Sequence, residues 1–150
     1  MSGKQSSTGL ILTCKKILKH LILFVIGGFV YCGIELLFRG RTHWSMFIVG
    51  GLCLIFCGML NEMWDNPALW KQMVLGSLII TLFEFVSGCI VNLWLGWNVW
   101  DYSNMPMNVM GQICLPFSLL WCLMALLAIF LDDLARYLLF KEKFPHYHFF

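Results

Sequence analysis

The chain has 150 residues, of which 60% are hydrophobic and 12% are charged, and its formal net charge is +2 at pH 7. Soluble globular domains carry about 25% charged residues, so this composition excludes an ordinary soluble domain and indicates one domain embedded in a membrane. The chain has no basic stripe with interleaved aromatic residues, so we expect the lipid bilayer rather than nucleic acid as its partner.

Four apolar segments follow a polar beginning. Residues 1–17 are predicted to form a flexible N-terminus. We predict membrane spans at residues 18–38, 44–60, 73–95 and 112–131, because each segment is near the 17–25 residues that cross the hydrocarbon core. Residues 132–150 are predicted to form a tail, in which Asp132, Asp133 and Arg136 mark the membrane surface. The predicted fold class is therefore an all-α, polytopic integral membrane protein with four transmembrane helices in a compact bundle.

Basic residues are distributed unevenly between the segments that connect the spans. One side of the membrane would hold eight of them and the other side only two, Arg39 and Arg41. The eight are Lys4, Lys15, Lys16, Lys19, Lys71, Arg136, Lys141 and Lys143. The positive-inside rule then predicts that both termini are cytoplasmic.

The two halves of the chain share one spacing. Gly27 precedes Glu35 by eight residues, and Gly76 precedes Glu84 by eight. This spacing favours a duplicated two-helix hairpin, as in parallel repeats. Chance is the alternative, because Gly is frequent in this chain.

Polar and small residues fall on one face of each predicted span. The stripe of the third span is Ser77, Thr81, Glu84, Gly88 and Asn92, and the fourth span has a similar stripe that includes Ser118 and Ala125. Small residues allow close helix contact and polar side chains bond across helices, so the stripes predict a packed bundle. The alternative is that they line a path through the membrane.

Glu84 lies near the middle of an apolar run. A carboxylate at that depth costs about 2.5–3.5 kcal/mol on insertion scales, so we expect it to face protein or water and to carry a proton or accept a cation. Glu35 precedes Arg39 by one helical turn, which predicts a structural ion pair. The candidate intramembrane polar residues are Glu35, Arg39, Thr81, Glu84 and Asn92.

No catalytic or metal-binding pattern stands out. Cys53 and Cys57 share a helix face and could bind a soft metal, but no further Cys or His pair has matching spacing. P-loop, HExxH, GxSxG and EF-hand patterns are absent. We therefore predict no enzymatic activity, no cofactor and no metal site.

The longest predicted outer connection, residues 96–111, contains the unusual run WDYSNMPMN. Asp, Ser and Asn invite local bonds between side chain and backbone, and Pro stops a helix. This pattern predicts either a structured cap over the bundle or an ordinary turn with an aromatic anchor. The cap would include Trp100, Asp101, Tyr102, Ser103, Asn104, Pro106, Asn108, Gly111, Gln112 and Pro116, the last of these inside the first turns of the fourth span.

These residues, together with Phe117, Ser118, Trp121 and the later LDDLARY, resemble the bacterial family of ABC-transporter permeases called CmpB or type IV. The resemblance covers most of the chain, up to Tyr137. It implies a bacterial inner-membrane protein that acts as a permease-like subunit of a transport system. It also implies an ATPase subunit supplied in trans and a homo- or hetero-oligomer that encloses the path.

Two features depart from ABC permeases in general. Such domains commonly have about six spans rather than four, and the connection 61–72 shows no recognisable coupling helix. An alternative function is therefore a non-transporting membrane scaffold, sensor or assembly protein whose buried carboxylates fix helix register. An intramembrane enzyme is disfavoured, because no nucleophile–base pair or metal cluster is evident.

Overall fold

The computed structural model describes the backbone of residues 2–64 and 67–149, and side chains from residue 13 onward within those ranges. Met1 of the predicted flexible N-terminus and the side chain of Lys4, which entered the charge count, lie outside the described residues. The described chain is all-helical. Its helices are α1 (Ser2–Arg39), α2 (Trp44–Met63), α3 (Leu69–Gly88), the π-helical turn η1 (Cys89–Trp94) and α4 (Leu115–Phe140).

Four helical segments in the described chain are long and apolar enough to cross a membrane: Thr13–Arg39, Trp44–Met63, Leu69–Trp94 and Leu115–Phe140. The four-span fold class is confirmed. The helices extend beyond the predicted spans, because hydropathy finds the apolar centre of a helix and not the polar turns that continue it. Thus α1 begins within the segment predicted to be flexible, and α4 continues nine residues past the predicted end at 131.

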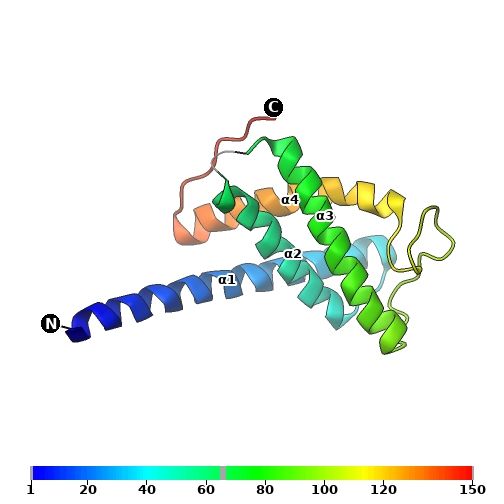
Figure 1. The fold of residues 1–150 in the computed structure, drawn as a ribbon, viewed down its shortest axis with the longest axis horizontal. Coiled ribbons are helices and arrows are strands. Elements are labelled where there is room, and N and C mark those ends of the chain that lie inside the picture. Colours follow the sequence, from blue (N-terminus) through cyan, green and yellow to red (C-terminus); the bar gives the residue numbers. More distant parts are fainter. Residues whose placement is uncertain (1, 65–66, 150) are drawn as a thin grey trace.

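The helices form two hairpins. α1 packs mainly against α2, and α3 packs mainly against α4, while α1 and α4 make little contact. Figure 1 shows α1 and α4 with roughly aligned axes and opposite chain directions, and α2 and α3 running obliquely to both. We call the end of the bundle near residues 95–114 the loop end, and the end near residues 64–68 the tail end.

One glycine in the first helix of each hairpin lies at a close contact with the second helix. A Cβ atom on Gly27 of α1 would lie 2.6 Å from Leu54 Cβ of α2, and one on Gly76 of α3 would lie 2.6 Å from Ala125 Cβ of α4. These are the glycines whose spacing suggested duplication, and each lies in the equivalent contact of its hairpin. The duplication itself stays a prediction.

The core lies among α2, α3 and α4, where Cys57, Ala125 and Ile129 are fully buried. After α4, residues 141–149 fold back over the tail end. Tyr147 Oη donates a hydrogen bond to Asp133 Oδ2 at 2.5 Å, and Leu69 N donates to His148 O at 2.8 Å. The second bond satisfies an amide at the start of α3, a helix that has no side-chain N-cap.

Candidate intramembrane polar site

Glu84 is buried in the third helix and faces protein, not lipid. Its side chain is 4% exposed, and each of its oxygens accepts one hydrogen bond. Tyr102 Oη donates to Oε1 at 2.9 Å, and Trp121 Nε1 donates to Oε2 at 2.7 Å. No described Lys, Arg or His forms an ion pair with Glu84, so two neutral donors replace the hydration that the carboxyl group loses.

The donor Tyr102 comes from the loop and is held by aromatic packing. Its ring stacks on Phe117 with the centroids 4.7 Å apart, and Phe117 in turn lies 5.9 Å from Trp121. Burial, followed by the nearby Glu84, raises the pKa of the Tyr102 hydroxyl. Tyr102 therefore keeps its proton and remains a hydrogen-bond donor to Glu84.

Two other members of the predicted third-span stripe, Ser77 and Thr81, contact α4, as a helix interface requires. Ser77 Oγ donates to Ser118 O at 2.6 Å, and Thr81 Oγ1 donates to Ser118 Oγ at 3.3 Å. Thr81 thus lies one turn from Glu84 on the same face. The stripe positions Glu84 against α4 by a series of short polar contacts.

Asn92 lies in the π-helical turn and joins α3 to the loop. Its Nδ2 donates to Gln112 Oε1 at 2.8 Å, and its Oδ1 accepts from Val99 N at 2.7 Å. Trp100 Nε1 donates to Gln112 O at 2.9 Å. Asn92, Trp100 and Gln112 are all buried, so the loop is fixed to the end of α3 by fully paired polar groups.

The loop is also bonded within itself. Asp101 Oδ1 accepts from Ser103 N at 2.8 Å and from Ser103 Oγ at 2.5 Å. Asn108 Nδ2 donates to Met105 O at 2.9 Å, and Asn108 Oδ1 accepts from Gly111 N at 3.1 Å. Of the two predicted arrangements, this is a structured cap with Trp100 and Tyr102 directed inward. The hydrogen bonds from Ser103 lower the pKa of Asp101.

Three residues of the predicted motif lie apart from this network. Asn104 and Pro106 are exposed at the loop surface. Pro116 lies in the first turn of α4, which begins at Leu115, as predicted. The N–H groups in the first turn of a helix have no intrahelical acceptor, so the N–H that proline lacks is not needed there. Pro116 therefore fits the start of α4 and leaves no helix carbonyl unpaired inside the membrane.

Glu35 forms the predicted ion pair in a second polar group at the loop end. Arg39 Nη1 donates to Glu35 Oε1 at 2.7 Å, and Thr42 Oγ1 donates to Oε2 at 2.7 Å. Arg39 Nη2 also donates to Val99 O at 2.8 Å, which attaches the loop to α1. Glu35 and Glu84 thus belong to separate hydrogen-bond networks.

A cavity of about 530 Å³ opens at the loop end between α1, the loop and α4. Glu35 and Arg39 line one side, while Tyr102 and Trp121, the two donors to Glu84, line another. Glu84 itself is behind these two side chains. The cavity therefore brings the two predicted polar groups to one space without direct contact between their carboxylates.

The structure also contains a buried polar cluster that the sequence analysis assigned to the membrane surface. Asp132 is fully buried, and Arg136, 4% exposed, donates from Nε to Asp132 Oδ2 at 2.5 Å. Arg136 Nη1 donates to Glu62, and Asn61 Nδ2 donates to Asp133 Oδ2 at 2.6 Å. These side chains are buried by protein, because residues 141–149 and the end of α2 pack against this part of α4, while their place at the membrane surface stays a prediction. In the sequence, the i,i+4 spacing of Asp132 and Arg136 was the pattern that could have indicated this ion pair.

No group of three or more His, Cys, Asp or Glu side chains in the described part of the chain is arranged to hold a metal ion. Cys53 and Cys57 both lie in the core, and the Cys57 thiol is directed at Gly76 O, 3.9 Å away.

Comparison with known proteins identifies the family. No curated protein and no solved structure matches the chain significantly. The four membrane-crossing helices make it a multi-pass membrane protein. The family model described as "Putative ABC-transporter type IV" matches residues 7–144, nearly the whole chain, and the chain therefore belongs to that family.

Proposed function

We propose that the chain is a permease-like membrane subunit of an ABC-type transport system, whose polar site is Glu84 with its two donors. The observation that carries this proposal is the loop-end cavity of about 530 Å³, because its wall includes both Tyr102 and Trp121. A molecule that enters the cavity touches the side chains that hold the Glu84 carboxyl group. Its binding is therefore coupled to a buried group that can exchange a proton.

The chain acts as one part of an assembly in this proposal. It has no P-loop, so an ATPase subunit supplies the energy in trans, and the chain is not itself an enzyme. Family membership supports this arrangement. The termini are cytoplasmic, where an ATPase subunit would reach the tail end. Because α1 and α4 make little contact, the bundle is open on one side, which favours an oligomer with its path between copies.

Co-purification in mild detergent tests the proposal. The tagged chain is purified from its own cells, and the bound proteins are identified by mass spectrometry. We expect a nucleotide-binding subunit in stoichiometric amounts. Recovery of the chain without any ATPase subunit, under conditions that preserve the fold, would contradict the proposal.

The role of the carboxyl group is tested in that complex. Glu84→Gln is compared with wild type in proteoliposomes, with ATP hydrolysis and subunit retention measured together. We expect the Glu84→Gln complex to retain its subunits and to lose its ATP-driven transport activity. The amide keeps the shape of the side chain but cannot exchange a proton. Ser87→Ala, which removes a hydroxyl on the same helix whose hydrogen bond goes only to a backbone carbonyl of α3, is the control and should leave the activity near wild type. Equal activity of wild type and Glu84→Gln would exclude the transport role of Glu84.

A non-transporting scaffold is the second candidate, and one observation favours it. Both oxygens of Glu84 and both oxygens of Glu35 are paired with protein donors. A fully paired carboxyl group is suited to fix the position of its helix. In that case Glu84→Gln would lower the stability of the protein, and no ATPase subunit would be recovered.

A further inference from the structure

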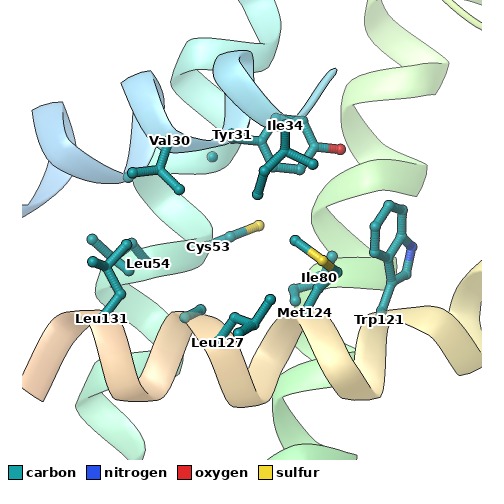
Figure 2. A pocket seen from close by; sticks show the side chains of 13 residues that line it. Val30, Tyr31, Ile34, Cys53, Leu54, Ile80, Trp121, Met124, Leu127 and Leu131 are labelled. Atoms are coloured by element: carbon teal, nitrogen blue, oxygen red, sulfur yellow. The ribbon is translucent and has the colours of Figure 1, made fainter. Parts of the chain in front are cut away.

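The loop-end cavity adjoins an apolar groove between α1 and α4. The narrower part of this groove has a volume of about 60 Å³ and reaches Gly27 on α1 and Leu131 on α4. Tyr31, Ile34, Trp121 and Met124 line both the cavity and the groove, so the two spaces are adjacent and separated only by these side chains. Figure 2 shows Val30 and Ile34 projecting from α1 and Leu127 from α4 into the same space, with Cys53 of α2 and Ile80 of α3 behind it.

The combined length of the cavity and the groove matches one leaflet of a bilayer. Arg39 and Gly27 are twelve residues apart on α1, which corresponds to about 18 Å at 1.5 Å per residue. The hydrocarbon of one leaflet is about 15 Å thick. The cavity and the groove together therefore match one leaflet in length. The groove alone, from Gly27 to Ile34, is about 10 Å long and accommodates part of an acyl chain, with the wider cavity at its end for a headgroup.

Charge at the wide end supports a ligand with an anionic group. Arg41 lines the cavity, and it forms no hydrogen bond or ion pair with any residue that the structure describes. Arg39, by contrast, is occupied by Glu35 and Val99 O. A guanidinium presents a planar fork of donors that matches a phosphate, and Arg41 is the side chain at this end with that fork unused.

We infer that this groove is a binding site for one phospholipid, with its phosphate on Arg41 and an acyl chain between α1 and α4. A cavity of about 530 Å³ is larger than a carboxylate needs, which favours a phospholipid over a free fatty acid. The inference deepens the proposed function, because it names an amphiphilic phosphodiester as the substrate class. The claim that this lipid is transported rests on the proposed function. The binding itself requires only the chain.

Native mass spectrometry of the chain alone in detergent, titrated with phosphatidylglycerol, tests the site. We expect one tightly retained lipid per chain. Arg41→Gln should weaken its binding about tenfold, because a hydrogen bond to a charged group contributes about 1.5 kcal/mol and each 1.4 kcal/mol is tenfold. Arg41→Lys keeps the charge but not the planar fork of donors, so it should recover only part of the affinity.

A second pair of variants tests the acyl-chain groove. Leu127 is 57% exposed and lines the groove, whereas Leu119 is 62% exposed on α4 and lines neither the groove nor the cavity. Leu127→Trp should fill the groove and abolish retention of the lipid, while Leu119→Trp should bind as wild type does. Both positions are exposed, so neither change disturbs the core.

Three results would overturn the inference. The first is wild-type lipid binding by both Arg41→Gln and Leu127→Trp. The second is equal affinity for oleate, which would make the ligand a fatty acid. The third is a dimer without bound lipid that Leu127→Trp dissociates, which would make the groove an interface between copies. Because no ATPase subunit or nucleotide is present, failure here is distinct from failure of the co-purification experiment.

Discussion

Tyr102 and Glu84 are eighteen residues apart, and the phenol of the first donates to the carboxyl group of the second across the loop end of the bundle. This bond makes the loop a part of the intramembrane site. Tyr102→Phe should keep the ring on Phe117 and remove one of the two donors to Glu84. An unpaired buried acceptor costs about 1–3 kcal/mol, so we expect a lower unfolding temperature in detergent. Tyr137→Phe, at a half-exposed position of α4, is the control and should have little effect.

Gly58 permits the burial of Asp132. A Cβ atom on Gly58 would lie 2.1 Å from Asp132 Cγ, so Gly58→Ala must displace the carboxyl group or separate α2 from α4. Overpacking of this kind costs about 1–3 kcal/mol, measurable by thermal unfolding. Gly33→Ala is the matched control, since a Cβ there meets nothing within 4 Å. It should be neutral or stabilising by up to about 1 kcal/mol, because Ala favours helix. Equal effects of the two changes would contradict the packing described here.

Arg136 compensates the buried Asp132. Arg136→Gln leaves that carboxylate without its cation, and breaking a buried pair in this way costs about 3–5 kcal/mol. We expect loss of folded protein in size-exclusion chromatography. The double change of Arg136→Met with Asp132→Leu should recover part of the loss, because it removes both charges at once. A double variant as unstable as Arg136→Gln would show that the pair has a role other than mutual compensation.

Asp101 makes the order of the loop dependent on pH. Its folded-state pKa lies below the ordinary value of 3.8, so its stabilising effect is complete above that value and is lost as the pH falls through the lower folded pKa. The loop should therefore be equally protected at pH 7 and pH 5, and lose protection only below about pH 4. Hydrogen exchange of peptides covering residues 100–111, corrected for intrinsic rates, measures this. Asp101→Asn should remove the acid-dependent step, and an unchanged step would assign it to another group.

The bundle was predictable from the sequence because lipid imposes simple requirements on it. Apolar runs of sufficient length located four helices, and helical spacing placed Ser77, Thr81 and Glu84 on the face that contacts α4. The pair Glu35–Arg39 followed from local geometry, since both partners lie on one helix.

Contacts between separate elements were not predictable in this way. The donors to Glu84 come from the loop and from α4, and their meeting depends on how α4 is rotated and where the loop returns. The burial of Asp132 depends on a tail that folds back over α4. Helical periodicity in the sequence does not predict this return of the chain. The π-helical turn at Asn92 has no pattern of its own, because it is fixed by the pairing of Asn92 with Gln112.

The hydrogen bond from Leu69 N to His148 O has a practical consequence for tagging this protein. Reporter fusions and affinity tags are often joined after the last residue of a membrane protein. Such an extension would pull on the carbonyl that holds the first turn of α3, and the perturbation would pass from there toward Glu84. Labels for topology mapping therefore belong before Ser2, where α1 begins.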